Sequence, residues 1–354
     1  MKKIKKILSH IFIDGLSGMA LGLFATLLVG TILEQVGNLV GGQIGSYIII
    51  VSTVAKKITG AGIGVGVAAK FKQSPLVTVS AAVAGMIGAF AKPIIAGTIL
   101  VEGNFVLAGV GEPLGAFIAA YTAVVIGSLI SGKTKIDILI TPICSIGAGA
   151  VIGLLIGSPI SEMMTKLGAM INWGAEQQPF VAGVVVSVLM GIALTLPISS
   201  AAIGLSLGLS GIAAGAATIG CCCNMVGFAV ASFRENKVSG LVSQGIGTSM
   251  LQMPNIMRKP VIWLPAIISS AVLGPISTCL FKMTSNPIGS GMGSCGFVGQ
   301  IMAYQTMVET KEPVIVLIEI VLMHFVLPAL LTLGISEMLR KVKVIKFGDM
   351  KLDV

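Results

Sequence analysis

The feature that most constrains this chain is a series of apolar stretches, each of a length suited to crossing a bilayer as a helix. A transmembrane helix needs about 20 mostly apolar residues. Shorter glycine-rich apolar pieces lie between the long stretches. We therefore expect an all-α integral membrane protein with about ten transmembrane helices, some of them broken or re-entrant. The long stretches lie near residues 11–33, 39–55, 76–100, 105–131, 138–160, 179–196, 199–217, 262–281 and 313–336.

Composition excludes a soluble protein. Of the 354 residues, 55% are hydrophobic and only 10% are charged, against roughly 25% charged residues in a soluble domain. Such a chain has too little polar surface to cover a globule in water. The formal net charge of +9 does not indicate nucleic-acid binding, because the basic residues gather at the two ends of the chain. We interpret residues 1–354 as a single membrane domain.

The charged ends predict an orientation. Because cytoplasmic segments carry an excess of Lys and Arg, both termini are expected to be cytoplasmic in a multi-pass membrane protein. The first apolar stretch is long enough to span and has no obvious cleavage site, so we interpret it as a retained span rather than a signal peptide. The terminal basic residues are Lys2, Lys3, Lys5, Lys6, Arg340, Lys341, Lys343, Lys346 and Lys351.

Short sequence echoes indicate an internal repeat. The segment Ile160-Ser161-Glu162-Met163 is echoed by Ile335-Ser336-Glu337-Met338. Three other pairs of matching segments occur in the same order along the chain. We expect two halves, approximately residues 1–170 and 171–354. Because lysines precede the first half but follow the second, we expect an inverted repeat of two five-helix halves. Basic loops at corresponding places in the two halves argue against the inversion. The other echoes are Phe12–Gly15 with Phe180–Gly183, Gly62–Gly64 with Gly245–Gly247, and Ala120–Thr122 with Ala303–Gln305.

Two glycine-rich interruptions occupy corresponding places in the halves. Glu112 lies in the first, Gly109–Gly115, next to Pro113, and Ser294 lies in the second, Gly289–Gly296. Paired interruptions indicate a binding site near the membrane midplane. A charge in an apolar segment is expensive and suggests function. Glu112 could bind solute hydroxyls or carry a coupling proton; alternatively it only caps a helix.

A second candidate site is a run of neutral polar residues, 243–255. If this run is helical, Gln244, Thr248, Gln252 and Asn255 recur at intervals of four, four and three and form a polar stripe, with Ser249 beside it. Amides and hydroxyls suit an uncharged sugar or polyol better than an ion. The alternative is an amphipathic helix lying on the membrane surface. Asn224 adds a polar group just before the run.

Other chemistry-bearing residues have open interpretations. His324, inside the last apolar stretch, could relay protons or pack against a neighbouring helix. Lys92 is either paired with a carboxylate such as Glu112 or extends to the interface. The run from Cys221 to Cys223 is interpreted as packing cysteines, with a metal or redox role as the alternative. His10 is too far in sequence from His324 to form a metal cluster with it.

Two motif matches fail in context. Residues 127–134 fit the Walker A pattern and residues 291–296 fit the dinucleotide glycine pattern. Each pattern needs a strand and a soluble α/β unit around it, whereas both lie between apolar stretches. We also find no hydrolase arrangement, so no catalytic residues, metal or cofactor are expected in this chain.

The stretch from Gly227 to Asn236, the run 243–255, Trp263-Leu264-Pro265 and Gly289–Gln300 resemble the enzyme IIC membrane proteins of the bacterial phosphotransferase system. The branch that is most similar includes the perfringolysin regulator, a toxin-gene regulator. The resemblance covers nearly the whole chain and implies a permease for a sugar or related small polar solute, and a homodimer. One departure is that no histidine and glutamate pair typical of the glucose-type enzyme IIC stands out.

The favoured hypothesis is a permease that works by alternating access. Any phosphotransferase activity would need separate IIA and IIB proteins, since no such domain is fused to the chain. The alternatives are a membrane-embedded ligand sensor that regulates gene expression, and an ion- or proton-coupled carrier independent of the phosphotransferase system. Proton coupling would involve Glu112, His324 or Lys92. The expected solute-binding residues are Glu112, Asn224, Gln244, Thr248, Ser249, Gln252, Asn255, Ser294 and Gln300.

Overall fold

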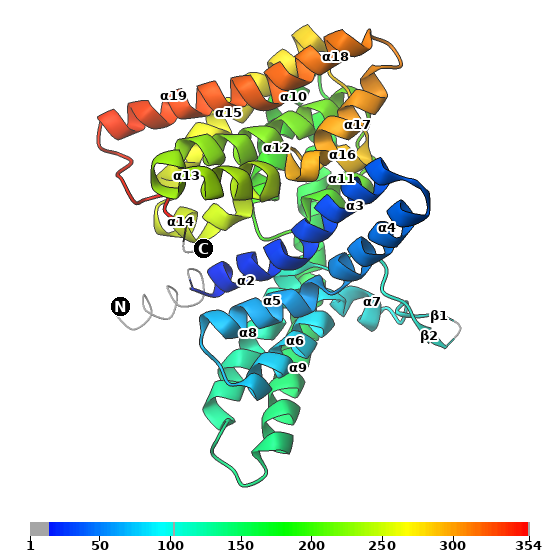
Figure 1. Ribbon diagram of the computed structural model, residues 1–354, viewed down its shortest axis with the longest axis vertical. Helices are drawn as coiled ribbons and strands as arrows, with labels where there is room; N and C mark the ends of the chain where they lie inside the picture. The colour runs from blue at the N-terminus through cyan, green and yellow to red at the C-terminus, as the bar shows by residue number, and fades with distance from the viewer. Residues whose placement is uncertain (1–13, 102, 353–354) are drawn as a thin grey trace. The chain divides into compact units, whose positions relative to one another are not determined.

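The computed structural model describes residues 14–101 and 103–352 and divides the chain into two compact units, Met1–Met163 and Met164–Val354 (Figure 1). Apart from one short hairpin, the regular elements that it describes are helical, which confirms the predicted all-α class. The N-terminal lysines, His10 and the Phe12 end of the first echo lie outside the described residues. The boundary at residue 163 lies close to the expected boundary of the repeat, but the repeat itself stays a prediction.

Unit 1 is built on helices that touch through glycines. A Cβ added at Gly22 of α2 would collide with the backbone of Gly62 in α5, and one added at Gly64 of α5 would collide with Ala81 in α6. Small residues allow this close approach where the hydrophobic effect between helices is absent. The elements are α2 (Leu16–Leu23), the π-helix η2 (Phe24–Leu28), α3 (Val29–Val40), α4 (Gly42–Lys57), α5 (Thr59–Lys70), α6 (Pro75–Ala89), α7 (Ala91–Ile95), β1 (Leu100–Val101), β2 (Asn104–Phe105), α8 (Pro113–Ile130) and α9 (Asp137–Ala175), which runs on past the boundary.

The first part of unit 2 surrounds α12 (Gly211–Ala231), which is buried along almost its whole length. It packs against α10 (Pro179–Thr195), α15 (Leu264–Pro275) and α19 (Leu327–Lys341). Close contact again depends on small residues, because a Cβ at Gly220 of α12 would collide with the backbone oxygen of Ser187 in α10. The other elements here are α11 (Ser200–Ser206), α13 (Phe233–Val242), the π-helix η3 (Ser243–Gly247), the 3₁₀ helix η4 (Ser249–Gln252), α14 (Met253–Arg258) and the 3₁₀ helix η5 (Pro260–Trp263).

The rest of unit 2 completes the cover of α12 and ends in a structured tail. We call residues 342–352, which follow α19, the C-terminal tail; within it Ile345 and Met350 are buried. The elements are α15 (Leu264–Pro275), the π-helix η6 (Ile276–Phe281), α16 (Pro287–Ser290), the 3₁₀ helix η7 (Cys295–Phe297), α17 (Val298–Met307), α18 (Pro313–Ile320), the π-helix η8 (Val321–Val326) and α19 (Leu327–Lys341).

Six stretches among the described residues are long and apolar enough to cross a membrane, and a seventh results if α4 and α5, bent by 55° at their junction, count as one span. Two further apolar helices, α6 and α10, are shorter. The multi-pass architecture and a broken span are therefore present, while the expected ten helices remain unconfirmed. The six are Leu16–Val40, Pro113–Ile130, Asp137–Gly157, Gly211–Ala231, Pro260–Phe281 and Pro313–Lys341.

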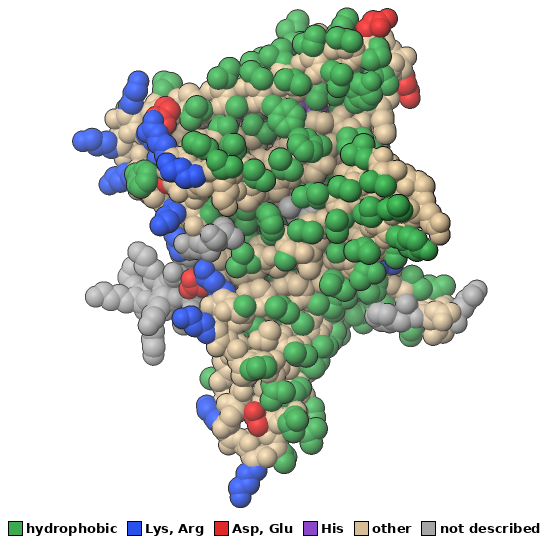
Figure 2. Space-filling view, in the orientation of Figure 1, with side chains coloured by type: hydrophobic (Ala, Val, Ile, Leu, Met, Phe, Trp, Pro, Cys, Tyr) green, Lys and Arg blue, Asp and Glu red, His purple; other side chains and the backbone are tan. Residues whose placement is uncertain are grey.

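Within unit 2, charge separates along the spans. Basic side chains gather where α13 and the end of α19 lie, and acidic ones gather near the start of α18, with hydrophobic side chains covering the surface between them (Figure 2). Glu309 and Glu312 precede α18, whereas Arg340 and Lys341 end α19. An excess of Lys and Arg at one end of a span is what the positive-inside rule describes.

Candidate functional site

Asn224, in the middle of α12, is one of the expected solute-binding residues that are fully buried. Its side chain is 0% exposed, and an added Cβ at Gly191 of α10 would collide with its amide nitrogen. The absence of a side chain at Gly191 therefore makes the room that the Asn224 amide occupies. A buried amide is costly unless its donors and acceptor are all satisfied, so its partners define the site.

Asn224 is the centre of a network of neutral side chains. Its Oδ1 accepts from the indole Nε1 of Trp263 at 2.8 Å and from the hydroxyl of Thr195 at 3.1 Å. Its Nδ2 donates to the backbone oxygen of Gly220 at 3.0 Å and to the Ser270 hydroxyl at 3.4 Å. The Thr195 hydroxyl shares a 2.7 Å hydrogen bond with that of Ser249. We call Thr195, Asn224, Ser249, Trp263 and Ser270 the Asn224 network.

A second chain of hydrogen bonds joins the amides of the run 243–255. Gln252 Nε2 donates to Gln244 Oε1 at 2.8 Å, and Asn255 Nδ2 donates to Gln252 Oε1 at 2.9 Å. Gln244 Nε2 in turn donates to the Ser232 hydroxyl at 2.9 Å. Gln244 and Gln252 are 0% exposed. The amides therefore lie inside the unit, which is not the arrangement of an amphipathic helix on the membrane surface. We call Gln244, Gln252 and Asn255 the amide chain.

Residues 243–255 do not form one regular helix, which is the condition on which the polar stripe depended. A π-helix runs from Ser243 to Gly247, Thr248 adopts extended backbone angles, and a 3₁₀ helix follows. Because Thr248 is extended, it and Ser249 are separated from the other residues of the predicted stripe. Thr248 accepts from the backbone N–H of Met250, and Ser249 joins the Asn224 network. Gln244, Gln252 and Asn255 still meet, because the irregular backbone brings them together by a different path.

The amide chain holds the C-terminal tail. Gln252 Nε2 donates to the backbone oxygen of Met350 at 2.9 Å, and Asn255 Nδ2 donates to that of Lys351 at 2.8 Å. Asn236 of α13 also binds the tail, through the Met350 oxygen and the Leu352 N–H, both at 2.8 Å. Two of the expected solute-binding residues, Gln252 and Asn255, therefore bind the tail of their own chain in this conformation.

Ion pairs reinforce the tail. Arg340 Nη2 binds Glu235 at 2.9 Å, and the Glu235 side chain is 0% exposed. Lys259 Nζ binds Asp349 at 2.5 Å. Burial tends to raise the pKa of Asp349, but hydrogen bonds from Lys259 and from the Lys346 N–H outweigh it and bring the pKa below its usual value. Asp349 is therefore a charged anchor of the tail at neutral pH.

The glycine-rich interruption of unit 2 is a real break in the helices. Gly293, Gly296 and Phe297 all have positive φ, between 52° and 60°, and Ser294 donates to the Gly245 oxygen at 2.6 Å. The break therefore lies against the π-helix η3. A Cβ at Gly293 would lie 2.6 Å from the Cβ of Cys221 in α12, so a glycine is needed here both for conformation and for space.

Gln300 and His324 form a separate buried pair. Gln300 Nε2 lies 3.2 Å from His324 Nδ1 and donates to the sulfur of Cys222 at 3.4 Å. Among the described residues, Gln300 Oε1 is buried without a hydrogen-bond partner. An unsatisfied buried acceptor is costly, so a hydrogen bond from a hydroxyl donor to this oxygen would be favourable. The packing and proton-relay interpretations of His324 both remain open.

Of the two unit 1 candidates, Glu112 lies at the other interruption and Lys92 lies in α7. Glu112 is half-buried and precedes α8, and Gly109 and Gly111 beside it have φ near +76° and +78°. The break predicted at Gly109–Gly115 is therefore present. The Glu112 N–H donates to the Ala89 oxygen at 2.8 Å. Lys92 in α7 is exposed, and both interpretations of it, pairing with a carboxylate and extension to the interface, remain open.

Sequence reasoning missed three members of the Asn224 network: Thr195, Ser270 and Trp263. Ser and Thr are common in membrane helices, so neither hydroxyl carried a signal. Trp263 did carry one, because a buried indole N–H needs an acceptor. Among the described residues, no group of three or more His, Cys, Asp or Glu could hold a metal ion, and Cys221, Cys222 and Cys223 are buried free thiols.

The chain matches a family model over residues 13–352, nearly its whole length, and that model is described as phosphotransferase system, EIIC. The chain belongs to the EIIC family of the phosphotransferase system. It is therefore a membrane transporter of that family. No curated protein matches the chain significantly. The buried neutral network of unit 2 therefore belongs to a transport protein. In such a protein, hydrogen bonds from protein groups must replace those that the solute makes with water.

Proposed function

We propose that this EIIC protein translocates a small polyhydroxylated solute, a sugar or a related polyol, by alternating access. The observation that carries the proposal is the Asn224 network, in which neutral donors and acceptors converge within a membrane-spanning unit. Uncharged amides, hydroxyls and an indole N–H match the hydrogen-bonding pattern of hydroxyl groups, whereas an ion would require charged or carbonyl ligands. The indole face of Trp263 could also pack against a sugar ring.

In the conformation described, the network is satisfied by its own members. Solute binding would therefore replace internal hydrogen bonds, chiefly the one between Trp263 and Asn224. Each such bond contributes about 0.5–1.5 kcal/mol net, so exchange for solute hydroxyls is nearly balanced. The division of the chain into two compact units supports movement of one unit relative to the other during access switching, and the inverted repeat would give that movement its symmetry.

We further propose that separate IIA and IIB proteins supply a phosphoryl group for the solute, and that the protein works as a homodimer in the bacterial plasma membrane with both termini cytoplasmic. Gln300, Ser294 and the amide chain are the next candidates for solute contact. The amide chain would become available only when the C-terminal tail leaves it. Glu112 and His324 are the candidates for proton coupling, and Lys92, being exposed, is the weakest.

The test is uptake by purified protein in liposomes against a panel of radiolabelled sugars, polyols and sugar acids. Thr195→Val removes one hydrogen-bond donor and keeps the side-chain volume, whereas Trp263→Phe removes one donor together with part of the ring. We expect each to reduce the initial rate about tenfold, since one hydrogen bond of about 1.4 kcal/mol corresponds to a factor of ten. Thr332→Val is the matched control, because the Thr332 hydroxyl donates to Ser269 at 2.9 Å in the same unit but outside the network.

The outcomes separate the alternatives. Uptake without added proteins establishes a self-sufficient carrier, and a loss of its pH dependence in Glu112→Gln identifies proton coupling. Uptake only after addition of cytoplasmic extract and phosphoenolpyruvate establishes dependence on phosphotransferase partners. Ligand-dependent thermal stabilisation with no uptake under either condition contradicts transport and favours a sensor, such as the toxin-regulator branch would contain. Equal losses in Thr332→Val and Trp263→Phe would contradict the assignment of the site.

A further inference from the structure

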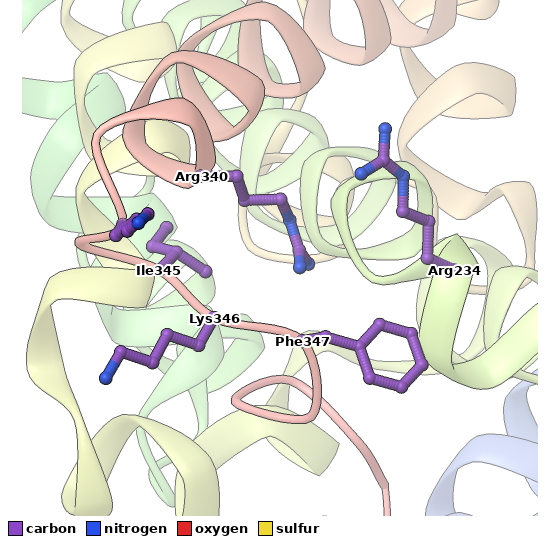
Figure 3. Close-up of a pocket in the computed structure, with 6 residues that line it drawn as sticks. Arg234, Arg340, Ile345, Lys346 and Phe347 are labelled. Atoms are coloured by element: carbon purple, nitrogen blue, oxygen red, sulfur yellow. The ribbon is translucent and has the colours of Figure 1, made fainter.

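A basic cavity of about 310 Å³ lies between α13, the end of α19 and the C-terminal tail (Figure 3). Four of its six lining residues are cationic and none is acidic. In Figure 3 the Arg340 side chain extends into the space between Arg234 and the tail. The volume falls at the lower end of the range for small-ligand sites. The lining residues are Arg234, Arg340, Lys343, Ile345, Lys346 and Phe347.

The charge of the cavity is only partly neutralised. Glu235 pairs with Arg340 at 2.9 Å, and Glu337 pairs with Arg234 at 2.8 Å. Lys343 and Lys346 are exposed, and Asp349 in the same tail is paired with Lys259 and accepts from the Lys346 backbone N–H. The positive charges of Lys343 and Lys346 are therefore not neutralised by these carboxylates.

A buried donor provides a second observation. The Arg340 side chain is only 8% exposed, and its Nε is buried with no hydrogen-bond partner among the described residues. Glu337 Oε1 lies 4.0 Å from that nitrogen, beyond hydrogen-bonding distance. A guanidinium with a free N–H and a planar fork is suited to a phosphate group.

The surroundings indicate where the anion comes from. The cavity lies beside the C-terminal end of the candidate span Pro313–Lys341, and the end of a span is where lipid headgroups are expected. Its other lining is apolar, from Ile345 and Phe347, and Phe347 is 75% exposed. The tail around it alternates exposed apolar residues, such as Val342 at 66%, with lysines. Aromatic and basic residues together are typical of a membrane interface.

We propose that this cavity binds the phosphate of an anionic phospholipid, with the lipid glycerol against Ile345 and Phe347 and the phosphate oxygens on Arg340, Lys343 and Lys346. The tail contributes four of the six lining residues. A bound headgroup therefore holds the tail in place, and with it the hydrogen bonds that the tail makes to Gln252 and Asn255. The inference does not depend on the identity of the transported solute.

The experiment titrates the purified full chain in zwitterionic detergent with dihexanoyl phosphatidylglycerol and measures binding by thermophoresis. Dihexanoyl phosphatidylcholine and inorganic phosphate, at equal ionic strength, are the two comparison ligands. We expect phosphatidylglycerol to bind at least about tenfold more tightly than either, and the double variant Lys343→Gln/Lys346→Gln to lose about tenfold or more of that affinity. The charge-matched control is Lys341→Gln/Lys351→Gln, which removes two exposed lysines outside the lining.

A second measurement tests the effect on the tail. Hydrogen exchange of residues 342–352 should slow on addition of phosphatidylglycerol in the wild type and the control, and should not change in the double variant. Equal loss of affinity in both double variants would show that binding depends only on the net positive charge of this region, and would overturn the proposed site. Equal binding of phosphatidylcholine would overturn the anionic requirement, and equal binding of inorganic phosphate would overturn the lipid source. Unchanged thermal stability of the variants is the check on folding.

Discussion

Asn224 illustrates how a single residue can organise a membrane unit. Its amide oxygen accepts two hydrogen bonds and its amide nitrogen donates two, and the four partners lie in four different elements: η5, α10, α15 and α12 itself. Because no water is available to replace a lost partner in the interior, each of these elements is held in register by the amide. Van der Waals contacts at glycines have no directional preference and do not fix how far one helix is shifted along another. The directional hydrogen bonds of the network do fix it.

At the same scale, Asp349 gives the tail a dependence on pH. Its pKa is lowered in the folded protein, so its contribution to tail docking is complete above the unfolded pKa of about 3.9 and is lost as the pH falls through the folded value. We expect protection of residues 345–352 from hydrogen exchange to be the same at about pH 7 and about pH 5, and to fall below about pH 4. Protection factors, corrected for intrinsic exchange, measure this.

Asp349→Asn should lower the protection of the tail at neutral pH and flatten its dependence on acid. Glu312→Gln, an exposed carboxyl before α18, is the control and should behave as the wild type. A fall in wild-type protection already between about pH 7 and about pH 5 would show that a different group titrates, since a carboxyl with a lowered pKa stays charged throughout that range.

Between elements, the contact of α10 with α12 depends on the absence of a side chain at Gly220. A Cβ there would collide with the backbone oxygen of Ser187, which cannot move aside as the end of a side chain could. We expect Gly220→Ala to separate the two helices, to destabilise the protein by about 1–3 kcal/mol or more, and to disturb the adjacent Asn224 network. Thermal unfolding in detergent, followed by intrinsic fluorescence, measures this.

Gly334→Ala in α19 is the matched control, because no heavy atom lies within 4 Å of the Cβ that it would add. It should be neutral or stabilising by up to about 1 kcal/mol, the difference between Ala and Gly in a helix interior. If both variants unfold at the same temperature, helix packing around α12 is looser than the described contacts require.

The limits of sequence reasoning are clearest at this level. The Gly109–Gly115 and Gly289–Gly296 breaks were predictable, because glycine clusters in apolar segments mark non-helical backbone. Thr248 was not, since its extended conformation reflects contacts with distant elements rather than local preference. Trp263 joins Asn224 and the tail joins Gln252 across 39 and 98 positions, and no local periodicity reports such partners. The sequence groups Gln244, Gln252 and Asn255 together, and they do hydrogen-bond to one another. It gives no sign that the C-terminal tail binds to them.

For the whole molecule, the distribution of charge predicts a topology. The segment from α18 to α19 forms one candidate span, Pro313–Lys341, with acidic residues before it and basic residues after it. We expect its basic end to be cytoplasmic. In a Cys144→Ser/Cys279→Ser background, Lys341→Cys should react with a membrane-impermeant maleimide only in inside-out vesicles, and Glu312→Cys only in right-side-out vesicles.

The four cysteines that remain in that background are buried, so they should not contribute to labelling, and the background protein itself is the control. Labelling of both introduced cysteines from the same side would contradict a span between them. Labelling of each from the side opposite to that expected would place the C-terminal tail, and the basic cavity with it, outside the cell.

The burial of α12 also has a consequence for how the protein is made. Its span has a mean hydropathy of 1.6, the lowest of the six candidates, whereas the later span Pro313–Lys341 reaches 2.6. Chain synthesis delivers α12 before α15 and α19, which later cover it. A nascent chain ending near residue 231 therefore presents Asn224 to lipid or to the insertion machinery with Trp263 and Ser270 not yet synthesised. Insertion of α12 should pause or depend on an assisting factor until residues 260–341 emerge, so that this helix enters the bilayer early and acquires its final neighbours late.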